Sequence, residues 1–274
     1  MEATRRTDAQ RVAELTRLFL LQLGVTLIVI GFPLFVLTEH TDDYFAWTIN
    51  PPLTAAFLGA NYWGSAVLAL LSAQERTWAV ARLTMPGIFV AGTLLLLATF
   101  LHIEPFHMDT VRGWLWVILY ALLPPSVVVL VAMQHRLGGH DAPRRAPLPA
   151  PARLILLAQA LVLLGVGALL FVAPGETASI WPWTLSDLAA RAIAAWLLAS
   201  GTTTLVSVHA DDWSRLRAPM MGYAAIAALQ LLALARYWDT LEDDASGWAY
   251  VAFIVSVLAV GIYGSVMSLR SRRP

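Results

Sequence analysis

Long apolar runs separated by short polar segments set the pattern of the chain. Each run is close to the roughly 20 residues that an α-helix needs to cross the hydrocarbon core of a bilayer. Because a spanning backbone must satisfy its hydrogen bonds within its own segment, the runs predict helices. The pattern predicts an all-α integral membrane protein with eight transmembrane helices at Leu18–Leu37, Leu53–Ala73, Leu83–Leu101, Trp114–Met133, Leu154–Ala173, Leu188–Val208, Pro219–Ala235 and Trp248–Leu269.

Composition supports this class. Hydrophobic residues make up 58% of the 274 residues and charged residues 13%, against about 25% charged residues in typical soluble domains. The formal net charge of zero argues against a nucleic-acid partner. The absence of cysteine excludes disulfides, thiolate metal sites and cysteine nucleophiles.

The basic residues, which are all arginine, divide the connections into two groups. Arg112 and Arg236 are the only arginines in the connections of one group, which are otherwise acidic. By the positive-inside rule, the arginine-rich group faces the cytoplasm, together with both termini. Arginine used alongside abundant Ala and Leu indicates a high-GC bacterium and therefore a bacterial plasma membrane. The predicted cytoplasmic arginines are Arg5, Arg6, Arg11, Arg17, Arg76, Arg82, Arg136, Arg144, Arg145, Arg153, Arg215, Arg217, Arg270, Arg272 and Arg273.

An internal repeat accompanies the eight runs. Matched pairs include Trp47-Thr48 with Trp183-Thr184, Trp78-x3-Arg82 with Trp213-x3-Arg217, and Gly113-Trp114 with Gly247-Trp248. The alternative is a chance alignment of Ala- and Leu-rich stretches, which the rarity of Trp and charged residues disfavours. We expect two parallel four-helix repeats, related by a pseudo-two-fold axis along the membrane normal. They cover residues 1–136, including a cytoplasmic lead, and 152–274, with a cytoplasmic linker at 137–151.

Two of the runs carry polar stripes at helical spacing. The stripe on the second run contains Thr54, Asn61, Ser65 and Ser72, and the stripe on the sixth contains Trp196, Ser200, Thr203, Thr204 and Ser207. One interpretation is a substrate path between the repeats. The other is helix packing, because small and hydroxyl residues let membrane helices approach closely and form hydrogen bonds.

Asp187 and Arg191 lie one turn apart near the outer end of the sixth run. An arginine at mid-bilayer costs about 2.5–3.5 kcal/mol on insertion scales. The side chain of Arg191 can avoid this cost by reaching outward and pairing with Asp187. The alternative is an anion-binding or gating arginine that faces the bundle interior.

His102, Glu104, His107 and Asp109 gather in one predicted outer connection. Imidazole and carboxylate groups together can bind a divalent metal. A solvated acidic rim is the competing explanation, because the spacing matches no established metal motif. The chain contains no phosphate-binding glycine loop, G-x-S-x-G or H-E-x-x-H motif, so no cofactor is predicted.

The stretches WTINPPLTAAFLGANYW, from Trp47, and LHIEPFH, around His102, resemble multi-pass membrane proteins of high-GC bacteria to which no activity is attached. Three functions remain open. The first is a small-solute or ion transporter or channel with a path between the repeats. The others are an outer-face membrane enzyme or metal-binding protein, and a structural or assembly subunit. The partners we expect are the lipid bilayer and either a second copy or a membrane complex.

Overall fold

The computed structural model describes residues 10–141, 143–177 and 180–272. The long helices are α2 (Glu14–Val36), α4 (Pro52–Ala73), α6 (Met85–Leu101), α7 (Val111–Arg136), α8 (Ala150–Val172), α10 (Asp187–Ala210), α11 (Arg217–Arg236) and α12 (Ala245–Arg270). The short helices α5 (Trp78–Ala81) and η2 (Arg82–Thr84) precede α6 and extend its span. Eight helices are long and apolar enough to cross a membrane, and no β-strand occurs in the described residues. The predicted all-α, eight-span fold is confirmed.

Local sequence explains where several helices begin. Pro52 is in the first turn of α4, where its missing N–H costs nothing. The Ser186 hydroxyl accepts a hydrogen bond from the Ala189 backbone N–H at the start of α10. The Asp244 carboxylate accepts from the N–H groups of Ser246 and Gly247 at the start of α12. Such caps satisfy backbone donors that have no partner inside the helix.

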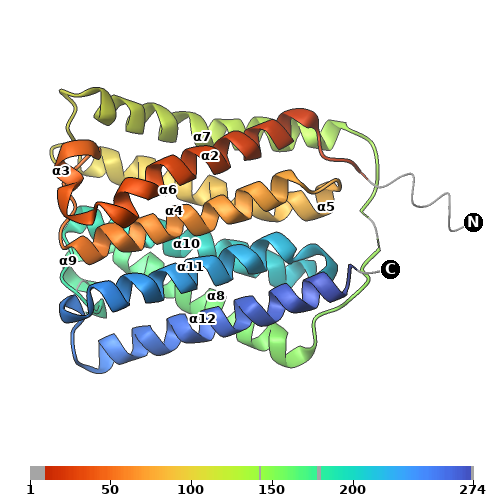
Figure 1. The fold of residues 1–274 in the computed structure, drawn as a ribbon. Helices are drawn as coiled ribbons and strands as arrows, with labels where there is room; N and C mark the ends of the chain where they lie inside the picture. Colours follow the sequence, from red (N-terminus) through yellow and green to blue (C-terminus); the bar gives the residue numbers. More distant parts are fainter. Residues whose placement is uncertain (1–9, 142, 178–179, 273–274) are drawn as a thin grey trace, which may run out of the picture.

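The helices form two layers of four (Figure 1). In one layer α4 packs between α2 and α11, and α12 packs on the far side of α11. In the other layer α10 packs between α8 and α6, and α7 packs on the far side of α6. Each layer therefore contains two helices from each half of the chain, and the halves meet at α4–α11 and at α6–α10.

Glycines allow the two central crossings. A Cβ added to Gly64 on α4 would lie 2.8 Å from the backbone nitrogen of Ile226 on α11. A Cβ added to Gly87 on α6 would lie 3.1 Å from the carbonyl oxygen of Ala199 on α10 and would collide with the Thr203 hydroxyl. Glycine at such positions lets membrane helices pack backbone against backbone.

Burial separates inner from outer helices. Most of α4 and α10 is buried, whereas α2, α7, α8 and α12 turn many large apolar side chains outward. Val111, Leu154 and Val172 are 74%, 69% and 79% exposed. Apolar surface of this extent on the outer helices is matched by the hydrocarbon of a bilayer.

The first long helix begins and the last one ends at the same end of the bundle, as Figure 1 shows. All described arginines lie at this end, hereafter the arginine end, except Arg112, Arg191 and Arg236. The opposite, acidic end contains the loops with Glu39, Glu104 and Asp239. Arg5, Arg6 and Arg273 lie outside the described residues.

Candidate functional site

Two cavities lie in series inside the bundle. The larger cavity, of about 290 Å³, lies between α8, α10, α11 and α12 and also touches α4. The smaller cavity, of about 80 Å³, lies nearer the arginine end, between α4, α6, α10 and α11, and also touches α2 and α7. Ser200, Tyr223 and Ile226 line both cavities. We call these three residues the junction, because they lie where one cavity gives way to the other.

The order along the helices shows that the cavities follow the membrane normal. On α11, Gln230 lines the larger cavity and Pro219, nearer the arginine end, lines the smaller one. On α4, Asn61 lines the larger cavity and Ser65 the smaller one. Together the cavities extend from the acidic end, past the middle of the bundle, toward the arginine end.

Amide and phenol groups supply most of the polarity of the larger cavity. The Tyr250 hydroxyl donates to Gln230 Oε1 over 3.1 Å. The Asn61 amide nitrogen donates to the Phe57 carbonyl over 2.9 Å. Gln230 and Asn61 are both buried. The rest of the wall is apolar or aromatic, and no charged side chain lines either cavity in the described part of the chain.

A hydrogen-bond chain holds the junction tyrosine. The Tyr223 hydroxyl donates to Gln159 Oε1 over 3.3 Å, and Gln159 Nε2 donates to the Ser256 hydroxyl over 3.0 Å. The Ser256 hydroxyl in turn donates to the Phe253 carbonyl over 2.7 Å. The chain joins α11, α8 and α12 and fixes the Tyr223 ring between the two cavities.

The structure brings seven residues of the two polar stripes to the cavity walls. They are Asn61, Ser65, Trp196, Ser200, Thr203, Thr204 and Ser207. The Thr203 and Thr204 hydroxyls donate to carbonyls four residues earlier, over 3.0 and 2.9 Å. Their oxygens therefore present acceptor lone pairs rather than free donors.

Thr54 and Ser72 are the stripe residues outside the cavity walls, and Thr54 has a packing role. Its buried hydroxyl accepts a hydrogen bond from the indole nitrogen of Trp183 over 2.9 Å. This bond links α4 to the loop that precedes α10. Thr54 lies outside both cavity walls.

Arg191 also lies outside both cavity walls. Its Nε donates to the Phe171 carbonyl at the end of α8 over 3.1 Å, and one of its terminal nitrogens contacts His102 Nε2. Asp187 is exposed nearby. Burial, followed by the neighbouring Arg191 charge, lowers the pKa of His102, and Asp187 partly opposes this shift. A neutral His102 can accept a hydrogen bond from Arg191.

A second arginine, like Arg191, donates hydrogen bonds to carbonyls at the end of a helix, in this case α2. Arg236 donates to the carbonyls of Phe35 and Val36 over 3.1 and 3.2 Å. The last carbonyls of a helix have no partner within it and carry partial negative charge, so a guanidinium there is stabilising. Arg191 and Arg236 therefore secure the acidic-end termini of α8 and α2.

The predicted metal residues do not form a cluster. His102 contacts Arg191, whose positive charge would repel a metal cation. Glu104 and Asp109 are exposed, and the backbone N–H of His107 donates to the Ala46 carbonyl over 2.9 Å. Among the described residues, no group of three His, Cys, Asp or Glu side chains is placed to hold a metal ion.

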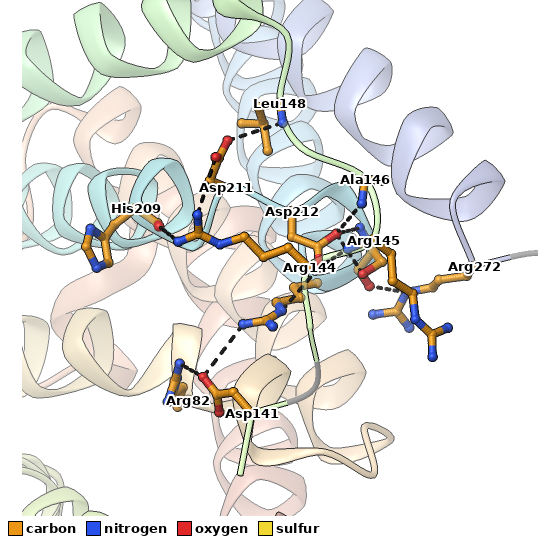
Figure 2. Close-up of polar contacts among 12 residues, drawn as sticks. Arg82, Asp141, Arg144, Arg145, Ala146, Leu148, His209, Asp211, Asp212 and Arg272 are labelled. Atoms are coloured by element: carbon orange, nitrogen blue, oxygen red, sulfur yellow. Dashed lines mark hydrogen bonds and ion pairs between the residues drawn. The ribbon is translucent and has the colours of Figure 1, made fainter. Parts of the chain in front are cut away.

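A polar clasp closes the arginine end (Figure 2). The connection 137–149 between α7 and α8 is held by the Asp212 carboxylate, which accepts from the N–H groups of Arg145 and Ala146 over 3.2 and 3.1 Å. Asp211 accepts from the Leu148 N–H over 3.2 Å. Asp141 pairs with Arg82 and Arg215.

The clasp positions an apolar cluster at the arginine end of the smaller cavity, and we call this cluster the plug. Leu148 is buried in a cluster that includes Trp213, Leu216 and Met220. Met220 also lines the smaller cavity. The connection between the halves therefore covers the arginine end of the two-cavity series.

Gln159, Tyr223, Gln230 and Tyr250 were not singled out from the sequence. An amide or phenol side chain inside an apolar run could have identified them, because such groups need a hydrogen-bond partner within a membrane. Comparisons of the chain with protein-family models, curated proteins and solved structures give no match. The function must therefore be argued from the geometry of the cavities.

Proposed function

We propose that the protein is a membrane transporter or channel for a small uncharged solute, and that the solute passes through the two cavities. The observation that carries the proposal is the arrangement of the cavities in series, meeting at Ser200, Tyr223 and Ile226. Moving a charge into such an apolar interior without a partner is costly. The uncharged lining therefore favours a neutral solute over an ion.

We also propose that the path lies in a duplicated four-helix unit. Helix contacts occur in matching pairs: α2–α4 with α8–α10, α6–α7 with α11–α12, and α4–α11 with α10–α6. A two-fold axis along the bundle would exchange the members of each pair. This pattern supports the repeat inferred from the sequence and puts the junction where the two units meet.

In the described conformation, the path is closed toward the arginine end. The plug around Leu148 and Met220 lies below the smaller cavity, and Tyr223 separates the cavities. Transport then requires movement of the junction and of the clasp at the arginine end. The connection 137–149 is suited to couple such a movement to both halves, because it joins them.

Solute uptake by liposomes tests the proposal. Purified protein would be reconstituted, and swelling in glycerol, urea and propionamide followed by light scattering. We expect faster uptake of at least one solute than in protein-free liposomes. Ser200→Phe, which fills the junction, should abolish the gain. Ser126→Phe on α7, outside both cavity walls, is the matched control and should retain it.

Two results would count against transport. One is swelling no faster than in protein-free liposomes for every solute. The other is a gain that Ser200→Phe and Ser126→Phe leave equally intact, because the solute would then cross elsewhere.

A further inference from the structure

The larger cavity reaches the outer surface between two helices that barely touch. α8 packs along α10 and α12 packs along α11, but α8 and α12 have little contact with each other. Val162 on α8 lines the cavity and is 47% exposed. Ala249 on α12 also lines the cavity and is exposed. The cavity therefore opens along the seam between these two helices.

The seam lies at the depth of the hydrocarbon. Val162 is about midway along α8, far from both ends of that helix. Its neighbours on the cavity rim, Val166 and Phe253, are apolar too. A molecule that enters beside Val162 comes from the lipid.

Two residues of the cavity wall, Gln230 and Trp181, have nitrogen donors without a described hydrogen bond. The Gln230 side chain is 4% exposed, and its oxygen accepts from Tyr250. Its amide nitrogen takes part in no hydrogen bond found among the described residues, and it is not one of the fully buried atoms that lack a partner. The indole nitrogen of Trp181, on the same wall, is buried without an acceptor in the described structure. A fully buried donor without an acceptor, such as the Trp181 indole nitrogen, is unfavourable, and the Gln230 amide nitrogen is a donor that a ligand in the cavity can use.

Aromatic rings form part of the cavity wall. The rings of Trp181 and Tyr250 have centroids 5.5 Å apart, and those of Phe57 and Trp181 have centroids 5.7 Å apart. The volume of about 290 Å³ is close to the lower limit, about 300 Å³, of typical small-molecule pockets. One ring fits such a space, and an attached apolar tail can extend through the seam.

We propose that the larger cavity binds a neutral, lipid-soluble molecule with a planar carbonyl headgroup, of the quinone class, which enters from the bilayer between α8 and α12. The Gln230 amide donates to a headgroup carbonyl, and the aromatic walls contact its faces. This inference goes beyond the proposed function, because it concerns a lipid-soluble ligand that reaches the larger cavity from the bilayer rather than a solute that passes through both cavities.

Binding in lipid nanodiscs tests this site without any transport step. The probes are decylubiquinone and, as a control without carbonyls, decylbenzene, each titrated calorimetrically. We expect saturable binding of decylubiquinone at one site and about tenfold weaker binding of decylbenzene, the value of roughly one buried hydrogen bond. Gln230→Leu should weaken decylubiquinone binding about tenfold and leave decylbenzene binding unchanged.

Seam variants test the route of access. Ala249→Phe and, on the facing helix, Val162→Phe narrow the opening and should reduce binding of both probes. Leu115→Phe on α7 is the matched control, because Leu115 is 61% exposed and lies outside both cavity walls. Thr99→Val removes a buried hydroxyl away from the cavities and controls for Gln230→Leu. Both controls should bind like the unaltered protein.

The inference is overturned if both probes bind equally well, or if Gln230→Leu and both seam variants bind decylubiquinone like the unaltered protein. Its failure can be distinguished from failure of the transport proposal. Probe binding without solute flux in liposomes would retain the site and remove transport. Solute flux without probe binding would retain transport and remove the site.

Discussion

In the first half of the bundle, aromatic rings pack together at the acidic end of α4, α6 and α7, and the smaller cavity, whose wall includes Tyr120, lies nearer the arginine end. In the second half, the larger cavity lies between α8, α10, α11 and α12. The ring centroids of Trp47 and Trp116 are 4.8 Å apart, and those of Trp116 and Tyr120 are 4.3 Å apart. Counted from the matched Gly113-Trp114 and Gly247-Trp248, these two α7 residues correspond to Tyr250 and Ile254. Smaller side chains at matching positions help to leave the second half hollow.

The polar groups around these matched α7 and α12 residues also have different partners. In the first half, the Trp116 indole donates to the Thr99 hydroxyl over 2.9 Å, and the hydroxyls of Tyr62 and Tyr120 bond to each other. In the second half, the Tyr250 hydroxyl donates to the oxygen of Gln230, which lines the larger cavity. The same helix arrangement thus supports different packing at matching positions.

Removing the aromatic ring of Trp116 should cause the largest loss of stability among the changes that test this comparison. Trp116→Ala empties a filled space and should lower the free energy of unfolding by about 3–5 kcal/mol. Tyr250→Ala enlarges a cavity that already exists and should cost less. Unfolding in mixed micelles, followed by circular dichroism, measures both. Equal losses would contradict the difference in packing between the halves.

A substitution at the α4–α11 crossing should cause the next largest loss of stability. Gly64→Ala pushes a Cβ against the backbone of Ile226, which cannot move aside, and should cost about 1–3 kcal/mol. Gly165→Ala on α8 is the control, because its Cβ would meet open space. The same unfolding assay applies. A Gly64→Ala protein as stable as Gly165→Ala would show that the two halves do not depend on this close approach.

The eight helices could be predicted from the sequence because the length and apolarity of each run are local properties. The polar stripes could also be placed, since helical spacing determines which residues share a face. Asn61 and Ser200 do line a cavity. The cavity itself could not be predicted, because its volume depends on side chains from five helices.

The partner of Arg191 was equally inaccessible from the sequence. Sequence proximity indicated Asp187, one turn away. The structure instead places the end of α8 within reach, so Arg191 donates to the Phe171 carbonyl. Such a contact depends on where separate helices end in space. Hydrophobic periodicity carries no information about it.

The clasp is a further asymmetry, because the Asp211-Asp212 pair follows a helix of the second half only. Asp212→Ala leaves the Arg145 and Ala146 N–H groups and the Arg215 guanidinium without this carboxylate. We expect a local loss of about 1–2 kcal/mol. Faster hydrogen exchange at 143–149, with unchanged exchange in α7, would reveal it. Unchanged exchange at 143–149 would contradict the role of Asp212.

The smallest effect should be a pH dependence at the acidic end. The pKa of His102 is lowered in the folded protein, so below its unfolded value of about 6.5 the unfolded state binds more protons. Stability is therefore full above about pH 6.5 and decreases as the pH falls through the folded pKa. The slope of unfolding free energy against pH should be smaller in His102→Gln than in the unaltered protein. An identical slope would assign the dependence to another group.

Cysteine labelling tests the central claim most directly, because the chain has no cysteine of its own. Gln230 lines the larger cavity, and its counterpart in the first half, counted from the matched Gly87 and Gly222, is the buried Leu95. Single variants Gln230→Cys and Leu95→Cys would be treated with N-ethylmaleimide in intact membranes and again after denaturation. We expect Gln230→Cys to react in membranes and Leu95→Cys to react only after denaturation. Equal reactivity of the two thiols in membranes would contradict a cavity beside Gln230 and close packing around its counterpart Leu95.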